Sequence, residues 1–231
     1  MSLLVYGIVE ADRIDPPGTG LDDEPLRVVV EGPLAAIISD HRGPDPAPTA
    51  AALSAFEHTV RRLTGRGAIL PAQFGSVFAD EAAVRAWLRR RCEDLLGRLH
   101  RVRDAVEIGL RASWRDGGRP APGRRTASGG SYLRERHELR QRARRVAHEL
   151  DPLTALARSS RRALIPQPDL PVLDAYLVEC GRVDEFVALV ARLGDVLDDV
   201  ELVCTGPWPP YSFAQRAPVS DVVPGGSGAS P

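Results

Sequence analysis

The strand and helix patterns after residue 105 constrain the fold of this chain most. Apolar and polar side chains alternate over 106–114, which is typical of a strand with one buried face. Five further periodic segments follow: a helix from about Ser131, a weak strand at 163–165, a strand at 172–180, a helix at 184–197 and a strand at 200–205. This order of strand, helix, strand, strand, helix and strand predicts a ferredoxin-like (βαββαβ) domain.

The residues before this series carry a separate set of patterns. They are, in order, a buried strand at 3–9, a hairpin of 27–31 and 34–39 around Gly32-Pro33, a helix at 53–63, an interrupted strand at 68–78 and a helix from Asp80 to Val102. Pro71 and Gly75 place the interrupted strand at a sheet edge or a bulge. We therefore predict an α+β protein of two domains. The N-terminal α/β domain, residues 1–102, has a small mixed sheet, and the ferredoxin-like domain spans 103–213.

Proline and glycine mark three further features. Residues 115–130 are rich in Gly, Pro and Arg and predict a flexible loop, whereas the Gly- and Ser-rich residues 214–231 predict a disordered tail. Pro152 lies inside the long helical pattern that follows the loop. Because proline lacks an N–H and clashes with the preceding turn, it should kink this helix or divide it in two.

The segment Gly206–Phe213 combines three prolines with three aromatic residues directly after the last strand pattern. Proline lacks the N–H that a strand ladder needs, so the strand should stop at Thr205. The aromatic side chains are too large to leave in water at low cost. We therefore expect a rigid, extended segment of the polyproline type, packed onto the domain surface.

Composition excludes several classes of partner and site. The formal net charge is −1, which gives no attraction toward nucleic acid or an anionic membrane. The cysteines Cys92, Cys180 and Cys204 include no CxxC pair, so neither a disulfide framework nor a zinc site is indicated. The first residues lack the basic region of a signal peptide, and no stretch approaches the roughly 20 apolar residues of a membrane span. A soluble cytoplasmic protein is expected.

The sequence contains no recognisable catalytic or cofactor-binding motif. The five histidines show no HExxH or comparable ligand spacing. Gly129-Gly130-Ser131 and Phe74-Gly75-Ser76 come nearest to a nucleophile elbow, and neither matches GxSxG. No GxGxxG or Walker A pattern occurs. The residues alone therefore predict no catalytic residue, no metal, no cofactor and no enzymatic activity.

Six short segments follow one another in a characteristic order: Leu4–Val9, Gly32–Ser39, Leu70–Phe78, Ser131–Leu133, Ala175–Val178 and Gly206–Phe213. Together they resemble the gas vesicle accessory family GvpF/GvpL. Each is weak alone, but the set in this order and spacing is specific and covers nearly the whole chain. One departure is Gln73, where the family pattern of proline, any residue, a basic residue, Phe and Gly has its base. A partner contact made by that base is therefore in question here.

The resemblance implies a two-domain protein with a ferredoxin-like C-terminal domain that acts in gas vesicle formation. It further implies that the protein binds the small, very apolar shell protein of the vesicle and other accessory proteins. No catalytic activity comes with the resemblance. The alternative is a small-ligand binder or an enzyme on a ferredoxin-like scaffold, which hosts many functions.

Two aromatic segments are the candidate contact residues for such partners. They are Phe74, Val77 and Phe78 on the edge strand, and Trp208, Tyr211 and Phe213 in the proline-rich segment. Exposed apolar surface drives association, and an open sheet edge can accept a further strand. The competing interpretation is that both sets serve internal packing, as most large aromatic side chains do.

Overall fold

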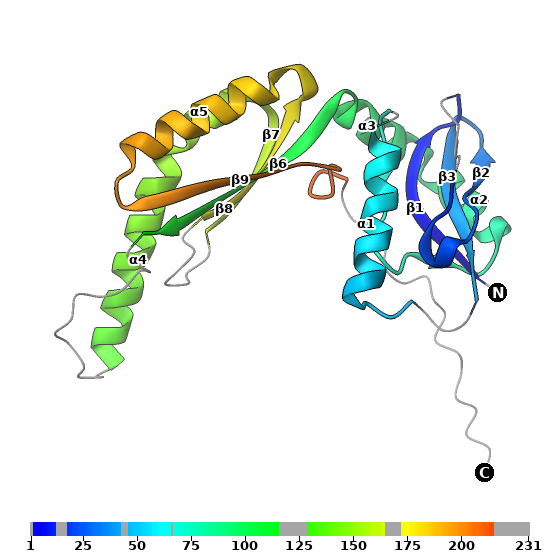
Figure 1. Ribbon diagram of the computed structural model, residues 1–231, viewed down its shortest axis with the longest axis horizontal. Coiled ribbons are helices and arrows are strands. Elements are labelled where there is room, and N and C mark those ends of the chain that lie inside the picture. Colours follow the sequence, from blue (N-terminus) through cyan, green and yellow to red (C-terminus); the bar gives the residue numbers. More distant parts are fainter. Residues whose placement is uncertain are drawn as a thin grey trace, which may run out of the picture. The chain divides into compact units, whose positions relative to one another are not determined.

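The chain divides into two compact units. The structure, a computed structural model, describes residues 2–12, 18–42, 46–65, 67–115, 129–164 and 172–214. Residues up to Arg103 form the first unit together with the segment that starts at Pro209, and Asp104–Trp208 form the second (Figure 1). Each unit has its own sheet and its own core, so the protein is α+β with two sheets.

The first sheet is built around β1 (Ser2–Glu10). Its neighbours are β3 (Leu34–His41) on one side and the short strands β4 (Leu70–Pro71) and β5 (Val77–Phe78) on the other, while β2 (Arg27–Glu31) pairs with β3. Every pairing is antiparallel, so the prediction of a mixed sheet was wrong. The reason is that β3 and β4 run in the same direction with β1 between them, and β1 is therefore antiparallel to both.

One core cluster of the first unit lies between this sheet and helix α1 (Ala50–Thr64). The side chain of Thr49 accepts a hydrogen bond from the N–H of Ala52 and caps the helix at its start. Phe56, Val60 and Leu63 recur at helical spacing and are buried, as their periodicity predicts. The helix thus turns one apolar stripe toward the sheet.

The predicted helix from Asp80 to Val102 is two helices. Helix α2 (Glu81–Arg90) and helix α3 (Cys92–Val102) are separated by Arg91, whose φ of −118° and ψ of 14° are not helical. Helix α2 packs against β2 and β3, whereas α3 packs against β1 and β4. The break lets each half follow a different part of a twisted sheet, and the continuous apolar stripe did not reveal it.

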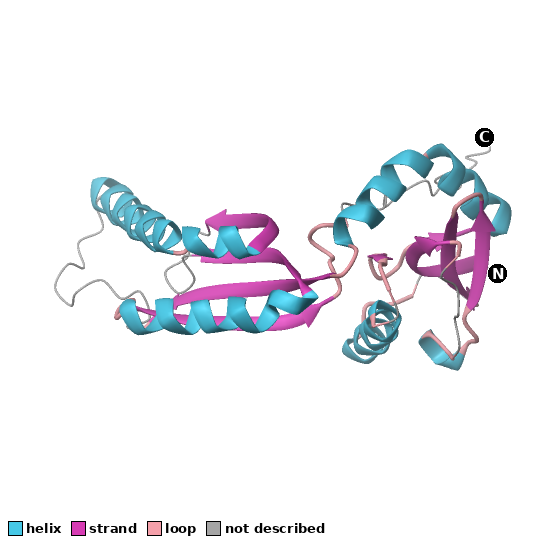
Figure 2. Cartoon of the chain, turned by 90° about the horizontal axis from the view of Figure 1, so that it is seen from above, coloured by secondary structure: helices cyan, strands magenta, loops and turns pink. Residues whose placement is uncertain are grey.

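The second unit has the predicted order of strands and helices. Its elements are β6 (Ala105–Trp114), α4 (Gly129–Glu149), β7 (Ala157–Leu164), β8 (Val172–Glu179), α5 (Val183–Val196) and β9 (Val200–Trp208). The strands lie in the order β7-β8-β6-β9 with antiparallel pairing throughout, and Figure 2 shows them running side by side along helices α4 and α5. One apolar cluster contains residues of both helices, including Val146 and Val190, so both cover the same face of the sheet.

Several boundaries in the second unit differ from the expectation. Helix α4 ends at Glu149, before Pro152, and a 3-10 helix (Asp151–Leu156) follows, so the predicted division occurs. Strand β7 begins at Ala157 and is much longer than the weak strand predicted at 163–165. Most of the predicted flexible loop 115–130 and of the predicted tail 214–231 lies outside the described residues.

The chain after Thr205 does not follow the prediction. Strand β9 continues to Trp208 because it is an edge strand, where proline on the unpaired side and an irregular register against β6 are tolerated. The prediction of an extended polyproline-type segment was also wrong. Residues 211–213 form a turn in which the N–H groups of Phe213 and Ala214 donate to the carbonyl oxygen of Pro210 at 3.1 and 2.8 Å.

Candidate functional site

Phe74 contacts an aromatic cluster in the core of the first unit. The ring of Tyr6 stacks on that of Phe56 with centroids 5.0 Å apart, and Phe74 meets Phe56 edge-on at 5.5 Å. Phe74 is half-buried, and the following Gly75 has a φ of 83°, a conformation that glycine adopts without strain. The turn at Gly75 thus aims Phe74 inward while Gln73 stays exposed.

Phe78 and Val77 lie on β5 and are also half-buried. The Phe78 ring meets Trp87 of α2 at 5.9 Å, and the Arg91 guanidinium lies over the Trp87 ring at 5.6 Å. The edge itself is a poor template for an added strand, because β4 and β5 have two residues each and Pro71 has no N–H. The exposed parts of these side chains, rather than the backbone, are what this edge can offer a partner.

Tyr211 and Phe213 belong to the first unit, although the prediction placed them in the second domain. Tyr211 packs against the same apolar cluster as Phe74. Its hydroxyl donates a hydrogen bond to Oε2 of Glu57 at 2.8 Å, and burial together with the Glu57 carboxylate raises the pKa of Tyr211. Phe213 is 3% exposed. These contacts explain why Tyr211 and Phe213 belong to the first unit. The order of the elements along the chain could not indicate it.

The six candidate residues thus occupy different environments. The structure brings Phe74 and Tyr211 to one cluster from distant parts of the chain, and it buries Phe213. Trp208 is half-buried in the second unit, where β9 pairs it with Glu107 of β6. Sequence analysis missed Glu57, because an acidic residue in a helix gives no sign of a partner 154 residues away.

The second unit contains a polar network centred on a buried acid, which sequence analysis also missed. Asp174 on β8 is 3% exposed, and its Oδ2 accepts hydrogen bonds from the Tyr176 hydroxyl at 2.7 Å and Arg162 Nε at 2.9 Å. Arg162 Nη1 also donates to Asp151, which contacts His148 at 3.0 Å. Burial and the Asp174 carboxylate raise the pKa of Tyr176. The available signal was an acid in the interior of a largely apolar strand.

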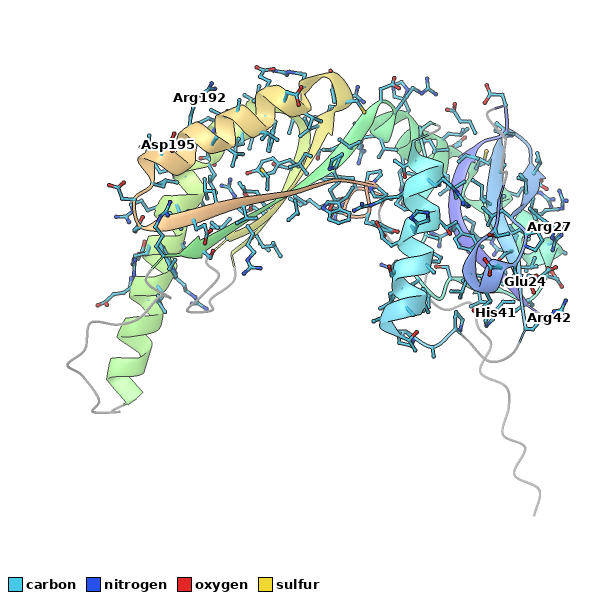
Figure 3. The ribbon with its side chains drawn as sticks, viewed as in Figure 1. Glu24, Arg27, His41, Arg42, Arg192 and Asp195 are labelled. Atoms are coloured by element: carbon cyan, nitrogen blue, oxygen red, sulfur yellow. The ribbon has the colours of Figure 1, made fainter. Side chains whose placement is uncertain are left out.

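Surface charges of the first unit are largely matched. Arg27 donates to Asp40 at 2.5 Å and to Glu81 at 2.9 Å, so it joins β2, β3 and α2. Glu24 and Arg42 lie 3.8 Å apart nearby, and Figure 3 shows them close to Arg27 and His41. Such exposed pairs contribute little stability individually.

Among the described residues, no cluster of three or more His, Cys, Asp or Glu side chains is suited to hold a metal ion. His58, His100, His137 and His148 are exposed on helices. Across the same residues, no helix combines the length and the apolar character that crossing a membrane requires.

The sequence matches one known protein family over nearly its whole length. The sequence profile described as "Gas vesicle synthesis protein GvpL/GvpF" matches residues 2–215. The chain belongs to the GvpL/GvpF family. The resemblance inferred from the ordered segments is therefore confirmed.

Relatives in this family match along nearly their whole length. The chain is 30% identical over 240 residues to Gas vesicle protein F of Streptomyces sp. (strain CB03234), covering 93% of this chain and 100% of the relative. It is 31% identical over 247 residues to Gas vesicle protein L of the same strain, covering 91% of each. Gas vesicle protein F2 of Halobacterium salinarum is 27% identical over 228 residues, again with 91% of each chain covered.

Solved structures of the family share the fold. The crystal structure of GvpF from Anabaena sp. PCC7120 superposes with a TM-score of 0.79 at 17% identity, covering 94% of this chain and 99% of that one. GvpF from Microcystis aeruginosa gives a TM-score of 0.77, also at 17% identity, with 93% and 99% covered. At such identities the likeness concerns the arrangement of both sheets and their helices.

Proposed function

We propose that this chain is a gas vesicle accessory protein that binds the hydrophobic shell protein and other accessory proteins during vesicle formation. The observation that carries the proposal is the full-length match to relatives named gas vesicle proteins F and L. The chain acts through surfaces that contact other polypeptides and not through bond-making chemistry. It does so in the cytoplasm, in association with the vesicle.

Physical chemistry supports such a role. A shell subunit with a large apolar surface aggregates if it is free in water, because exposed apolar patches of several hundred Å² drive association. A protein that covers this surface transiently prevents aggregation. Half-buried aromatic side chains suit the task, since they combine large contact area with a fixed geometry.

The contact residues we propose are Phe74, Val77, Phe78, Trp208 and Tyr211, which all keep part of their side chains in water. Phe213 is a core residue in this proposal because it is 3% exposed. The internal contacts of Phe74, Phe78 and Tyr211 support a dual role. One edge of each ring packs in the unit, and the other edge remains for a partner.

We further assign the two units as two domains, the second of them ferredoxin-like. The assignment rests on its order of strand, helix, strand, strand, helix and strand and on the strand order β7-β8-β6-β9 with antiparallel neighbours. Both helices on one face complete the pattern.

The test is co-purification of the tagged shell protein with this chain. Wild type is compared with Phe78→Ala, Trp208→Ala and Tyr211→Ala, each checked for its melting temperature. His58→Ala is the control, because His58 is exposed on α1 and outside the candidate set. If a variant no longer captures the shell protein but keeps its melting temperature, the residue contacts the partner. If only the melting temperature falls, the residue serves internal packing. Failure of wild type to capture the shell protein or any accessory protein contradicts the proposal.

Vesicle formation in cells separates this proposal from the alternative of an enzyme or small-ligand binder. The gene set for vesicle formation is expressed with and without this chain, and vesicles are counted by electron microscopy. Fewer or malformed vesicles without the chain support an assembly role. A normal vesicle population in its absence would contradict it.

A further inference from the structure

The second sheet has one face that neither of its helices covers. On β6, Leu110 and Ala112 point into the core beneath α4 and α5, so Arg111 between them points to the opposite side. Antiparallel sheets with one solvated face normally carry polar side chains on it. Leu173 on β8 and Val203 on β9 are apolar residues on this outer face that nevertheless remain exposed.

The outer row consists of Ala163, Leu173, Arg111 and Val203, one residue from each strand in the order β7, β8, β6 and β9. Their backbone registers pair them directly: Ala163 with Leu173, Leu173 with Arg111, and Arg111 with Val203. Paired residues point to the same side of a sheet. Leu173 is 43% exposed and Val203 40%, so two of the six large apolar side chains most exposed in the described part of the chain share this row.

Arg111 is the charged member of the outer row. Its side chain is exposed, and within the described residues no hydrogen bond or ion pair engages its guanidinium. Its neighbours on both sides are aliphatic, which leaves a cation at the centre of an apolar strip. A complementary surface therefore needs two aliphatic groups with a carboxylate between them.

The spacing of the row fits a helix laid across the strands. Neighbouring strands lie about 4.8 Å apart, so Leu173 and Val203, two strands from each other, are about 10 Å apart. Residues i and i+7 of an α-helix are separated by about 10.5 Å along its axis, with i+3 and i+4 midway on the same face. We propose that the outer row docks an amphipathic helix of another protein, with aliphatic residues at i and i+7 and Asp or Glu at i+3 or i+4.

A second copy of this chain is a poorer occupant of the row. Face-to-face pairing of two copies centred on the row brings one Arg111 against the other. Like charges placed opposite each other without a counter-ion disfavour such an interface. The charge thus selects an acidic partner.

Two synthetic helical peptides of about 18 residues test the proposal. Both carry Leu at i and i+7 on an otherwise neutral helix, and they differ only in Glu or Lys at i+3 and i+4. Binding to the full chain is measured by fluorescence anisotropy at low and at physiological salt. We expect the Glu peptide to bind about tenfold more tightly than the Lys peptide, in line with the coupling of a close interfacial charge pair.

Matched variants locate the site. Arg111→Glu should reverse the peptide preference, and the double variant Leu173→Ser with Val203→Ser should abolish binding of both peptides. Val187→Ser and Arg192→Glu are the controls, because both side chains are exposed on α5, where Figure 3 labels Arg192, and they should leave binding unchanged.

Three results would overturn the proposal. They are failure of wild type to bind the Glu peptide, equal affinity for the two peptides, and retained binding in the Leu173 and Val203 double variant. A fourth such result would come from analytical sedimentation, which gives the oligomeric state of wild type and of the double variant. If wild type is a dimer and the double variant is a monomer, the outer row binds a second copy of the chain and not a helical partner.

Discussion

The hydroxyl of Tyr211 donates a hydrogen bond to Glu57 Oε2 at 2.8 Å across 154 residues of sequence. This contact joins the segment after β9 to helix α1 of the first unit. The residues between them include the whole second unit, so the first unit is assembled from both ends of the described chain.

Loss of the Tyr211 hydroxyl should destabilise the first unit measurably. Tyr211→Phe is expected to cost about 1 kcal/mol, less than the roughly 1.5 to 3 kcal/mol of hydrogen bonds to charged groups, because Glu57 keeps 32% of its side chain in water. Tyr211→Ala should cost about 2 kcal/mol more, since a half-buried ring leaves the cluster. Urea denaturation measures both. Equal stability of wild type and Tyr211→Phe would show that the contact is absent in solution.

Asp174→Asn should destabilise the second unit. The substitution removes the charge that Arg162 Nε contacts at 2.9 Å and weakens the acceptor of the Tyr176 hydroxyl. We expect a loss of about 2 to 3 kcal/mol, less than for a fully buried pair because Arg162 is partly exposed. Glu185→Gln, in the exposed pair with Arg182, is the control and should leave stability unchanged. Similar denaturation midpoints for the two variants would refute the prediction.

Two glycine-to-alanine substitutions should have opposite effects. A Cβ at Gly7 on β1 would lie 2.6 Å from Ile69 Cδ1 and 2.9 Å from the backbone oxygen of Leu70, so Gly7→Ala should destabilise the first sheet. Gly97 lies inside helix α3 with nothing within 4 Å of its added Cβ. Gly97→Ala should therefore stabilise the protein by about 0.5 to 1 kcal/mol through the higher helix propensity of alanine. Thermal melting of both variants measures the two changes: the melting temperature should fall for Gly7→Ala and rise for Gly97→Ala.

Alkaline pH should unfold the protein through its buried tyrosines. Burial raises the pKa of Tyr6, Tyr176 and Tyr211, and the carboxylates of Asp174 and Glu57 add to the effect on the last two. Their unfolded pKa is about 10, so above that pH the unfolded chain releases protons that the folded chain keeps. Stability should be complete below about pH 10 and fall as the pH rises further.

The tyrosinate absorbance of the native chain checks this prediction. Of the four tyrosines, at least these three should titrate later than in the denatured chain. A native titration that overlays the denatured one would contradict it. Tyr211→Phe should remove one late-titrating group, which assigns part of the signal.

Local sequence periodicity correctly predicted those helices and strands whose bounds do not depend on distant parts of the chain. The alternation over β6 and the apolar stripe of α1 were visible because each reflects one buried face, and Pro152 marked the end of α4 through its own missing N–H. The family was likewise recognisable from short segments in a fixed order. These features depend on residues that lie near one another in the chain.

Tertiary structure decided the features that depend on distant neighbours. The break at Arg91 follows the twist of the sheet beneath α2 and α3. Strand β9 continues through Pro207 because β9 is the edge strand of its sheet in the described part of the chain. Which aromatic residue packs inward, as Phe213 does, depends on the cavity that the folded unit offers. The sequence alone determined the helices, the strands and the family, because all of these depend on patterns among residues close together in the chain. Pairing, burial and the partners of Asp174 and Glu57 arose only when packing brought remote side chains together.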